Sequence, residues 1–253
     1  MVEVKTMRVK LTIAYDGTNY SGWQIQSNGI TVQDVLNQAL KNLLGEDVRT
    51  IGASRTDAGV HALGNVAVFD TTSQIPAEKF SYALNARLPE DIRIQRSEEV
   101  PTDFHPRFTT TIKTYEYQIL NRTFADPTRR LYSFHWYGKL DLEAMQQAAL
   151  YLVGEHDFKS FATESPDVTT TVRTINSIRL WKENDMIHIR VTGNGFLYHM
   201  VRIIAGTLLE VGKANYRPEQ IQKILTAKDR RAAGPTARAQ GLTLVEICYP
   251  DWE

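Results

Sequence analysis

The sequence predicts an α+β protein made of two ferredoxin-like halves that form a mainly antiparallel sheet with helices packed on one face. Segments in which apolar and polar residues alternate, as in half-buried strands, recur along the chain. Between them lie segments with apolar residues at helical spacing. In the first half the predicted order is strand, helix, strand, strand, helix, strand, which is the order of a ferredoxin-like unit.

The first half is expected to end near residue 104, so that residues 1–104 form the N-terminal α/β half. Thr31 can cap its first helix, Gly45 can close that helix, and Pro76 can open the second one. The helices are expected at residues 32–44 and 76–86. The strands are expected at residues 8–15, 65–71 and 91–96, with a short apolar segment at 48–51 before the second of these.

Residues 105–253 are expected to form the C-terminal α/β half. Asp141 can cap a helix, and residues 183–185 have the polar composition of a hairpin turn. We expect strands at residues 109–120, 172–181, 186–191 and 242–249, and helices at residues 142–153, 195–211 and 218–227. We find no internal repeat, so the two halves would be similar folds with unrelated sequences.

The composition is that of an ordinary globular protein, with 42% apolar and 23% charged residues among 253. No apolar run approaches the roughly 18 residues that span a membrane, and the first ten residues have no signal-peptide core. The single cysteine, Cys248, excludes an internal disulfide framework. We therefore expect a cytoplasmic protein without a membrane segment.

Charge and histidine spacing exclude other classes of function. The 29 basic and 29 acidic residues balance, which argues against a protein that coats nucleic acid indiscriminately, although a segregated basic face could still bind RNA. The six histidines show no metal-binding spacing, and Gly193-Asn-Gly195 lacks the third glycine of a dinucleotide fingerprint. We expect no metal and no small-molecule cofactor.

The segment at residues 51–61 is the most informative in the chain, because charged residues and glycines stand between two predicted strands. Arg55 and Asp57 lie two residues apart, and Gly52 and Gly59 flank them. Glycines allow a tight turn or a close approach to a ligand. The alternative is an ordinary turn in which Asp57 bonds its own backbone.

Two further residues could either pack or act. Tyr115 lies in the predicted strand 109–120, where it is either a core aromatic or a ligand contact. Arg202 lies within an apolar helix and, if buried there, needs a carboxylate partner. That partner is either an active-site acid or another acid in a purely structural ion pair.

Two loops could contact RNA because they carry aromatic or basic residues, and the alternative for each is a packed or solvated connection. They are residues 16–24 with Tyr20 and Trp23, and residues 121–135 with Arg122, Arg129, Arg130 and Tyr132. Residues 230–240 form a basic loop before the final strand, whose arginines could simply be solvated charges.

The string Arg55-Thr-Asp57-Ala-Gly59-Val-His61-Ala62 resembles the catalytic motif of the tRNA pseudouridine synthase A family. The resemblance covers roughly residues 8–250. It recurs in the loop after the first strand, around Tyr115, around Arg202 and in the proline-containing loop before Leu244.

This resemblance implies an isomerase that converts uridine to pseudouridine at positions 38, 39 and 40 in the anticodon arm of tRNA. It implies an active-site cleft between the two halves, with Asp57 as the essential carboxylate and Arg202 paired with it. Tyr115 would stack on the target base and Arg55 would fill the space that this base leaves. Leu244 or its neighbours would line the wall, and His61 would order the loop rather than act in catalysis.

The resemblance also implies a homodimer with tRNA as its partner and no cofactor. Two other functions remain open from the residues alone. A non-catalytic RNA-binding protein would use exposed aromatics without needing Asp57. A carboxylate-dependent nucleosidase usually needs two cooperating acids, whereas this motif supplies only one.

Overall fold

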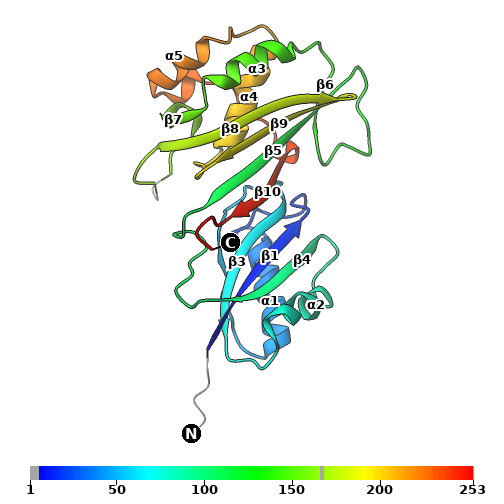
Figure 1. Cartoon of the computed structure of the whole chain (residues 1–253). Coiled ribbons are helices and arrows are strands. Elements are labelled where there is room, and N and C mark those ends of the chain that lie inside the picture. The colour runs from blue at the N-terminus through cyan, green and yellow to red at the C-terminus, as the bar shows by residue number, and fades with distance from the viewer. Residues whose placement is uncertain (1–5, 166–167, 253) are drawn as a thin grey trace. The chain divides into compact units, whose positions relative to one another are not determined.

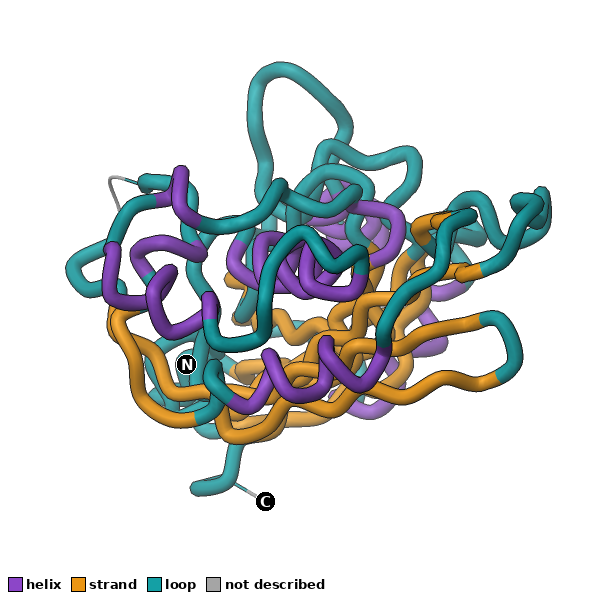
Figure 2. The backbone as a smooth tube through the Cα atoms, turned by 90° about the horizontal axis from the view of Figure 1, so that it is seen from above, coloured by secondary structure: helices purple, strands orange, loops and turns teal. Residues whose placement is uncertain are grey.

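The computed structural model describes residues 6–165 and 168–252 (Figure 1). These residues form ten β-strands and five α-helices, joined by loops and short 3₁₀ turns. The pairings among β1 to β4 and among β5, β7, β8 and β9 are all antiparallel, whereas β6 runs parallel to β5. The predicted α+β class with a mainly antiparallel sheet is therefore confirmed. Figure 2 shows the strands (orange) and helices (purple) from a second direction.

The chain divides into two compact units, and the division differs from the expected halves 1–104 and 105–253. The first unit extends to Thr111 and takes up the chain again at Leu244, whereas the second is Ile112–Thr243. The difference arises because the last strand lies beside β3 of the first unit. Strand pairing between residues far apart in the chain leaves no signal in local composition. The return of the last strand to the first unit was therefore not predicted.

The first unit has the strand order of a ferredoxin-like sheet, with β4 beside β1, β1 beside β3 and β2 on the far side of β3. This confirms the prediction for the first half. Its elements are β1 (Met7–Tyr15), α1 (Val32–Leu44), β2 (Ile51–Gly52), β3 (His61–Thr71), α2 (Phe80–Asn85), β4 (Ile92–Val100) and most of β10 (Leu242–Cys248).

The alternation of fully buried and half-buried residues along β1 shows which face of this sheet packs against the core. Val9, Leu11 and Ile13 are fully buried, while the residues between them are half-buried. The buried stripes of α1 and α2, which include Leu36 and Phe80, pack on this apolar side. A sheet with one covered face fixes its register, because a slip of one residue would turn the core side chains outward.

The helix signals at both ends of α1 are confirmed. The Thr31 hydroxyl accepts a hydrogen bond from the amide of Asp34 at 3.3 Å. Gly45 has a φ of 76° and donates its amide to the carbonyl of Lys41. The second helix differs slightly, because Pro76 opens a 3₁₀ turn at Ala77–Lys79 before α2 begins.

The second unit contains β5 beside β9, β9 beside β8 and β8 beside β7. The hairpin between β8 and β9 turns at Asn184, as the sequence predicted. The elements are β5 (Ile112–Asn121), β6 (Phe134–Trp136), α3 (Leu142–Leu150), β7 (Gly154–Asp157), β8 (Val172–Glu183), β9 (Met186–Gly193), α4 (Met200–Gly212) and α5 (Gln220–Ala227).

Two short strands, β6 and β7, were not predicted. Strand β6 lies at the end of what was expected to be a polar loop, and β7 begins where the helix over residues 142–153 was expected to end. Strands of three or four residues are too short to show a two-residue period. The cap at Asp141 was predicted correctly, since its carboxylate accepts the amide of Ala144 at 3.0 Å.

Helix α4 is the core of the second unit. Eleven of its 13 residues are buried, so apolar side chains face protein in nearly every direction. In the described part of the chain, no helix is long and apolar enough to cross a membrane.

Candidate active site

The segment between β2 and β3 holds Asp57 on a tight turn. The amide of Val60 donates to the carbonyl of Asp57 at 3.1 Å, and Gly59 has a φ of 76°, which favours glycine. Arg55 is exposed and Asp57 is half-buried, whereas Thr56 between them is buried. The carboxylate and the guanidinium are therefore presented on the accessible side of a loop whose other side is anchored.

The anchor is a buried hydrogen-bond network. The Tyr15 hydroxyl lies 2.7 Å from the Thr56 hydroxyl, and the Asn65 amide nitrogen donates to the Tyr15 hydroxyl at 3.2 Å. The same Asn65 nitrogen donates to the carbonyl of Ser54 at 3.1 Å. Strands β1 and β3 thus hold the residue directly before Asp57 and the residue directly before Arg55.

Strand β3 begins at His61, four residues before the strand predicted at residues 65–71. Pairing with β1 passes from Ile13 opposite Asn65 to Tyr15 opposite Ala62, so β3 contains one extra residue there. This irregularity is a β-bulge, a feature that often lies beside functional loops. The bulge hides the alternation over its first residues, which is why the strand was predicted to start later.

The loop after β1 supports the motif and does not offer stacking surfaces for RNA. Trp23 is 1% exposed and Tyr20 is 7% exposed, so the expectation that they contact nucleotides is wrong. The Trp23 amide donates to the carbonyl of Thr56 at 3.1 Å. A Cβ atom on Gly22 would lie 2.5 Å from the same oxygen. This loop therefore packs directly against the backbone that carries Asp57.

His61 joins the same two loops, because its Nδ1 accepts the amide of Gly17 at 3.1 Å. A Cβ atom on Gly17 would lie 2.0 Å from the carbonyl oxygen of Val60, so only glycine fits there. The predicted ordering role of His61 agrees with these contacts.

Tyr115 lies in β5 opposite Val191 of β9. It is 8% exposed, and its ring meets Phe196 edge-on with the ring centroids 5.2 Å apart. The residue is thus a packed cross-strand aromatic that keeps a small accessible area. Phe196 comes from the loop that leads into α4.

Arg202 lies in the first turn of α4 and is half-buried, not fully buried as the sequence suggested. Its Nε donates to the carbonyl of Ala237 at 2.8 Å, and the Ala237 amide donates to the carbonyl of Arg202 at 3.0 Å. This reciprocal pair fixes the direction of the arginine side chain. The partner residue, Ala237, gave no signal in the sequence.

The segment from residue 233 to residue 238 is attached along the length of α4. The amide of Gly234 donates to the Thr207 hydroxyl at 3.0 Å. A Cβ atom on Gly206 would lie 1.8 Å from the carbonyl oxygen of Pro235. This segment was expected to be a basic loop, and we name residues 233–238 the arginine clamp because they hold Arg202 in place.

Tyr117 in β5 is a further residue of this region that was not predicted as part of the site. It is fully buried, and its hydroxyl donates to the carbonyl of Arg238 at 2.9 Å. Burial raises the pKa of the Tyr117 phenol above its ordinary value, while the charges of Arg202 and Arg238 act in the opposite direction. Its position two residues after Tyr115, on the same face of a strand, could have identified it.

The predicted site residues come from both compact units. Arg55, Asp57 and Leu244 belong to the first unit, and Tyr115 and Arg202 belong to the second. Leu244 is fully buried in β10, so its side chain is part of the packed interior in this structure.

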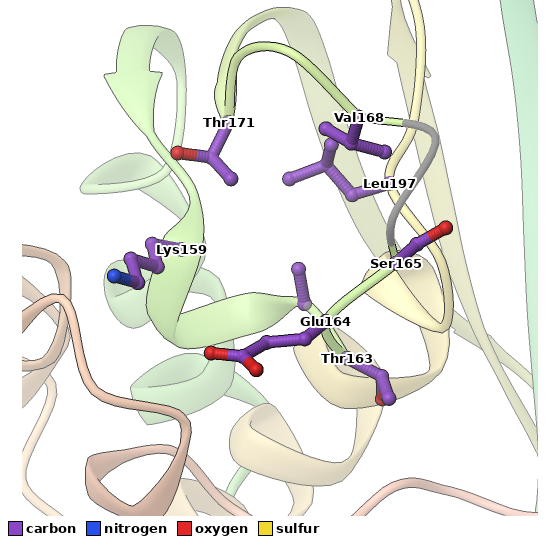
Figure 3. A pocket seen from close by; sticks show the side chains of 8 residues that line it. Lys159, Thr163, Glu164, Ser165, Val168, Thr171 and Leu197 are labelled. Atoms are coloured by element: carbon purple, nitrogen blue, oxygen red, sulfur yellow. The ribbon is translucent and has the colours of Figure 1, made fainter.

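A cavity of about 470 Å³ in the second unit contains none of the predicted site residues (Figure 3). Apolar side chains such as Leu197 and Val168 line much of it, with Lys159 and Glu164 at its border. Thr163 in its wall lies 3.0 Å from Nδ1 of His199, the residue before α4. In the ranges 6–165 and 168–252, no three His, Cys, Asp or Glu side chains gather as a metal site.

Comparison with known proteins gives one consistent result. The model of the tRNA pseudouridine synthase family matches residues 11–109 and 148–250. A relative from Ruminiclostridium cellulolyticum, named tRNA pseudouridine synthase A, is 53% identical over 96% of this chain and 99% of its own length. Proteins of the same name from Acetivibrio thermocellus and Brevibacillus brevis are 51% and 48% identical, over 95% and 96% of this chain and 99% of each relative.

Proposed function

Because the chain belongs to the tRNA pseudouridine synthase family, which isomerises uridine to pseudouridine, we propose that Asp57 is the carboxylate on which this reaction depends. The protein is an isomerase that acts on tRNA. The support for Asp57 comes from its place: a half-buried acid on the accessible side of a loop that two strands hold from behind.

The reaction conserves all atoms of the nucleotide. The N1–C1′ bond breaks, the base rotates, and C5 forms a bond with C1′; the proton on C5 leaves, and N1 gains one. A carboxylate can serve this reaction in two ways: by attacking the ribose or base as a nucleophile, or by removing the 2′ proton so that a glycal forms. Both need Asp57 in its ionised form.

The remaining site residues have distinct roles in this proposal. Arg202, which the arginine clamp holds in one direction, supplies the positive charge of the site. Tyr115 holds the base during its rotation, which needs only the small area that this residue leaves accessible. Arg55, exposed beside Asp57, occupies the space of the extruded uridine, and Leu244 backs the wall of the site.

The proposed substrate is the anticodon arm of tRNA, with uridines at positions 38, 39 and 40. This follows from the resemblance to synthase A and from relatives that carry this name over nearly their whole length. We propose that the enzyme acts in the cytoplasm as a homodimer. A protein that modifies three neighbouring positions would recognise the shape of the arm rather than one sequence.

The test uses unmodified tRNA that carries tritium at C5 of its uridines. Because C5 exchanges its hydrogen for C1′, isomerisation releases tritium into water. We expect release by the wild-type enzyme and a loss of at least about 10³-fold with Asp57→Asn, which keeps the shape of the side chain and removes its charge.

Two other outcomes of the same assay distinguish the alternatives. Free uracil in the reaction would show a carboxylate-dependent nucleosidase, because the base would then leave the sugar permanently. Tight tRNA binding with no tritium release by the wild type would show a non-catalytic RNA-binding protein. Full activity of Asp57→Asn would refute the role proposed for this acid.

A further inference from the structure

Three arginines lie close together between α5 and β10, and the structure separates them by what surrounds each. Arg230 points back into the protein, where it donates to the carbonyl of Gly234 at 2.9 Å and to the Thr236 hydroxyl at 3.1 Å. Burial lowers the pKa of Arg230, as expected for a guanidinium that packs against backbone. Its role is to stiffen the arginine clamp.

Arg231 is exposed and forms an ion pair with Asp229 at 2.8 Å. That hydrogen-bonded pair holds the pKa of the Asp229 carboxyl below its usual range. The charge of Arg231 is thus compensated by Asp229, and an exposed ion pair of this kind contributes little to stability.

Arg238 differs from both. It is exposed, and among the residues that the structure describes its guanidinium has no ion-pair or hydrogen-bond partner. Its backbone is nevertheless held firmly, because the carbonyl of Arg238 accepts the buried Tyr117 hydroxyl. The residue before it, Ala237, is joined to Arg202 by two hydrogen bonds.

This arrangement places an uncompensated cation in the arginine clamp itself, directly after Ala237, which is hydrogen-bonded to Arg202. Both guanidinium groups are near enough to Tyr117 for their charges to act on its phenol. The guanidinium of Arg238 has no counter-charge among the described residues, so it can bind an anion. An exposed guanidinium on a well-held backbone is suited to a phosphate, which it can bind through two parallel hydrogen bonds.

We propose that Arg238 is a tRNA-binding residue that holds a backbone phosphate next to the uridine undergoing isomerisation. This inference rests on the proposed function, since it takes Arg202 as part of the active site. It assigns the basic segment before the last strand three separate tasks: stiffening by Arg230, a local ion pair at Arg231, and substrate binding at Arg238.

The experiment measures the affinity of unmodified tRNA at several salt concentrations. The Asp57→Asn background is used so that the substrate is not consumed, and tritium release checks this directly. Replacing a phosphate-binding arginine makes the negative slope of log association constant against log salt concentration shallower by about 1. We expect this reduction for Arg238→Ala, together with a roughly 3–10-fold weaker affinity at about 0.1 M salt.

Arg231→Ala is the matched control, because it removes the same charge from an exposed residue of the same segment. We expect its slope to equal that of the parent protein. Arg238→Lys keeps a positive charge and should retain the parent slope. Both Arg238 variants should unfold at the parent temperature, since the contacts of this residue are made by its backbone.

The inference is overturned if Arg238→Ala and Arg231→Ala show the same slope, either because neither changes it or because both do. The proposed function would be refuted by a different result. Either the wild-type enzyme would release no tritium, or the Asp57→Asn enzyme would still release it. The two ideas can therefore fail independently.

Discussion

At the scale of single residues, the position of Asp57 depends on three buried polar side chains. Tyr15, Thr56 and Asn65 form a buried network that fixes the loop from its inner side. Loss of one such hydrogen bond leaves a buried polar group unsatisfied and costs about 1–3 kcal/mol. Since a displacement of about 1 Å can reduce catalysis 100-fold, the larger effect should appear in the rate.

We predict that Tyr15→Phe lowers kcat about 10-fold or more and leaves KM for tRNA nearly unchanged. Tyr249→Phe is the control. It removes a buried hydroxyl from the same compact unit, where it donates to the carbonyl of Pro106 at 3.0 Å. Both variants should lose similar stability in a urea titration, but only Tyr15→Phe should lose kcat. Equal kcat values for the two variants would contradict a positioning role for Tyr15.

The residues that the sequence revealed are those whose chemistry is unusual in their setting. Asp57 and Arg55 stood out because they lie in the string from Arg55 to Ala62, which resembles a catalytic motif. Tyr15 and Asn65 were missed because Tyr15 also satisfies the alternation of a core strand, and an asparagine in a strand has no distinctive pattern. Hydrogen-bond partners far apart in the chain can only be identified once the backbone is placed.

At the scale of elements, the join between α4 and the arginine clamp determines where Arg202 points. Gly206 is the point of closest approach, with no room for a side chain against the carbonyl of Pro235. Replacing a helical glycine by alanine normally stabilises a helix by about 1 kcal/mol. Here the added methyl group must displace backbone, and such overpacking costs about 1–3 kcal/mol, so the collision outweighs the gain.

We predict that Gly206→Ala lowers the unfolding temperature and reduces tRNA isomerisation, because the clamp must move away from Arg202. Gly212→Ala at the C-terminal end of α4 is the control, since its Cβ would meet the flexible thioether of Met145, which can shift. Differential scanning calorimetry and the tritium assay measure both effects. If Gly212→Ala proves the more damaging variant, the close approach at Pro235 does not have the importance assigned to it.

Element boundaries were predictable where a cap marks them, as at Thr31, Gly45 and Asp141. They were not predictable where pairing alone creates the element. Strands β6 and β7 exist because a neighbouring strand is available to them, and the start of β3 is masked by its bulge. Local sequence contains periodicity and caps but no information about the neighbour.

At the scale of the whole molecule, the path of the chain makes the first unit discontinuous. Phe104 lies 4.9 Å from the ring of Tyr249 and 5.1 Å from that of Trp252, measured between ring centroids. Burying one large apolar side chain contributes about 1.5–3 kcal/mol, while the net stability of a domain is about 5–15 kcal/mol. The contacts that Tyr249 and Trp252 make with Phe104 are thus a sizeable part of the stability of this unit.

We predict that a fragment comprising residues 1–111 does not fold cooperatively. The same fragment followed by a Gly/Ser linker and residues 244–253 should fold, because the linker restores the strand beside β3 and the aromatic cluster at Phe104. Far-UV circular dichroism during urea titration, with near-UV signals from the aromatic cluster, measures both fragments. A cooperative transition in residues 1–111 alone would refute the prediction.

The discontinuous first unit also has a consequence for synthesis on the ribosome. The polypeptide that carries Asp57 emerges early, yet the strand that completes its sheet is translated only after the second unit. The second unit can fold while the first still waits for that strand. A chain released prematurely would therefore carry the acid on an unfinished scaffold, and only full-length product would become active enzyme.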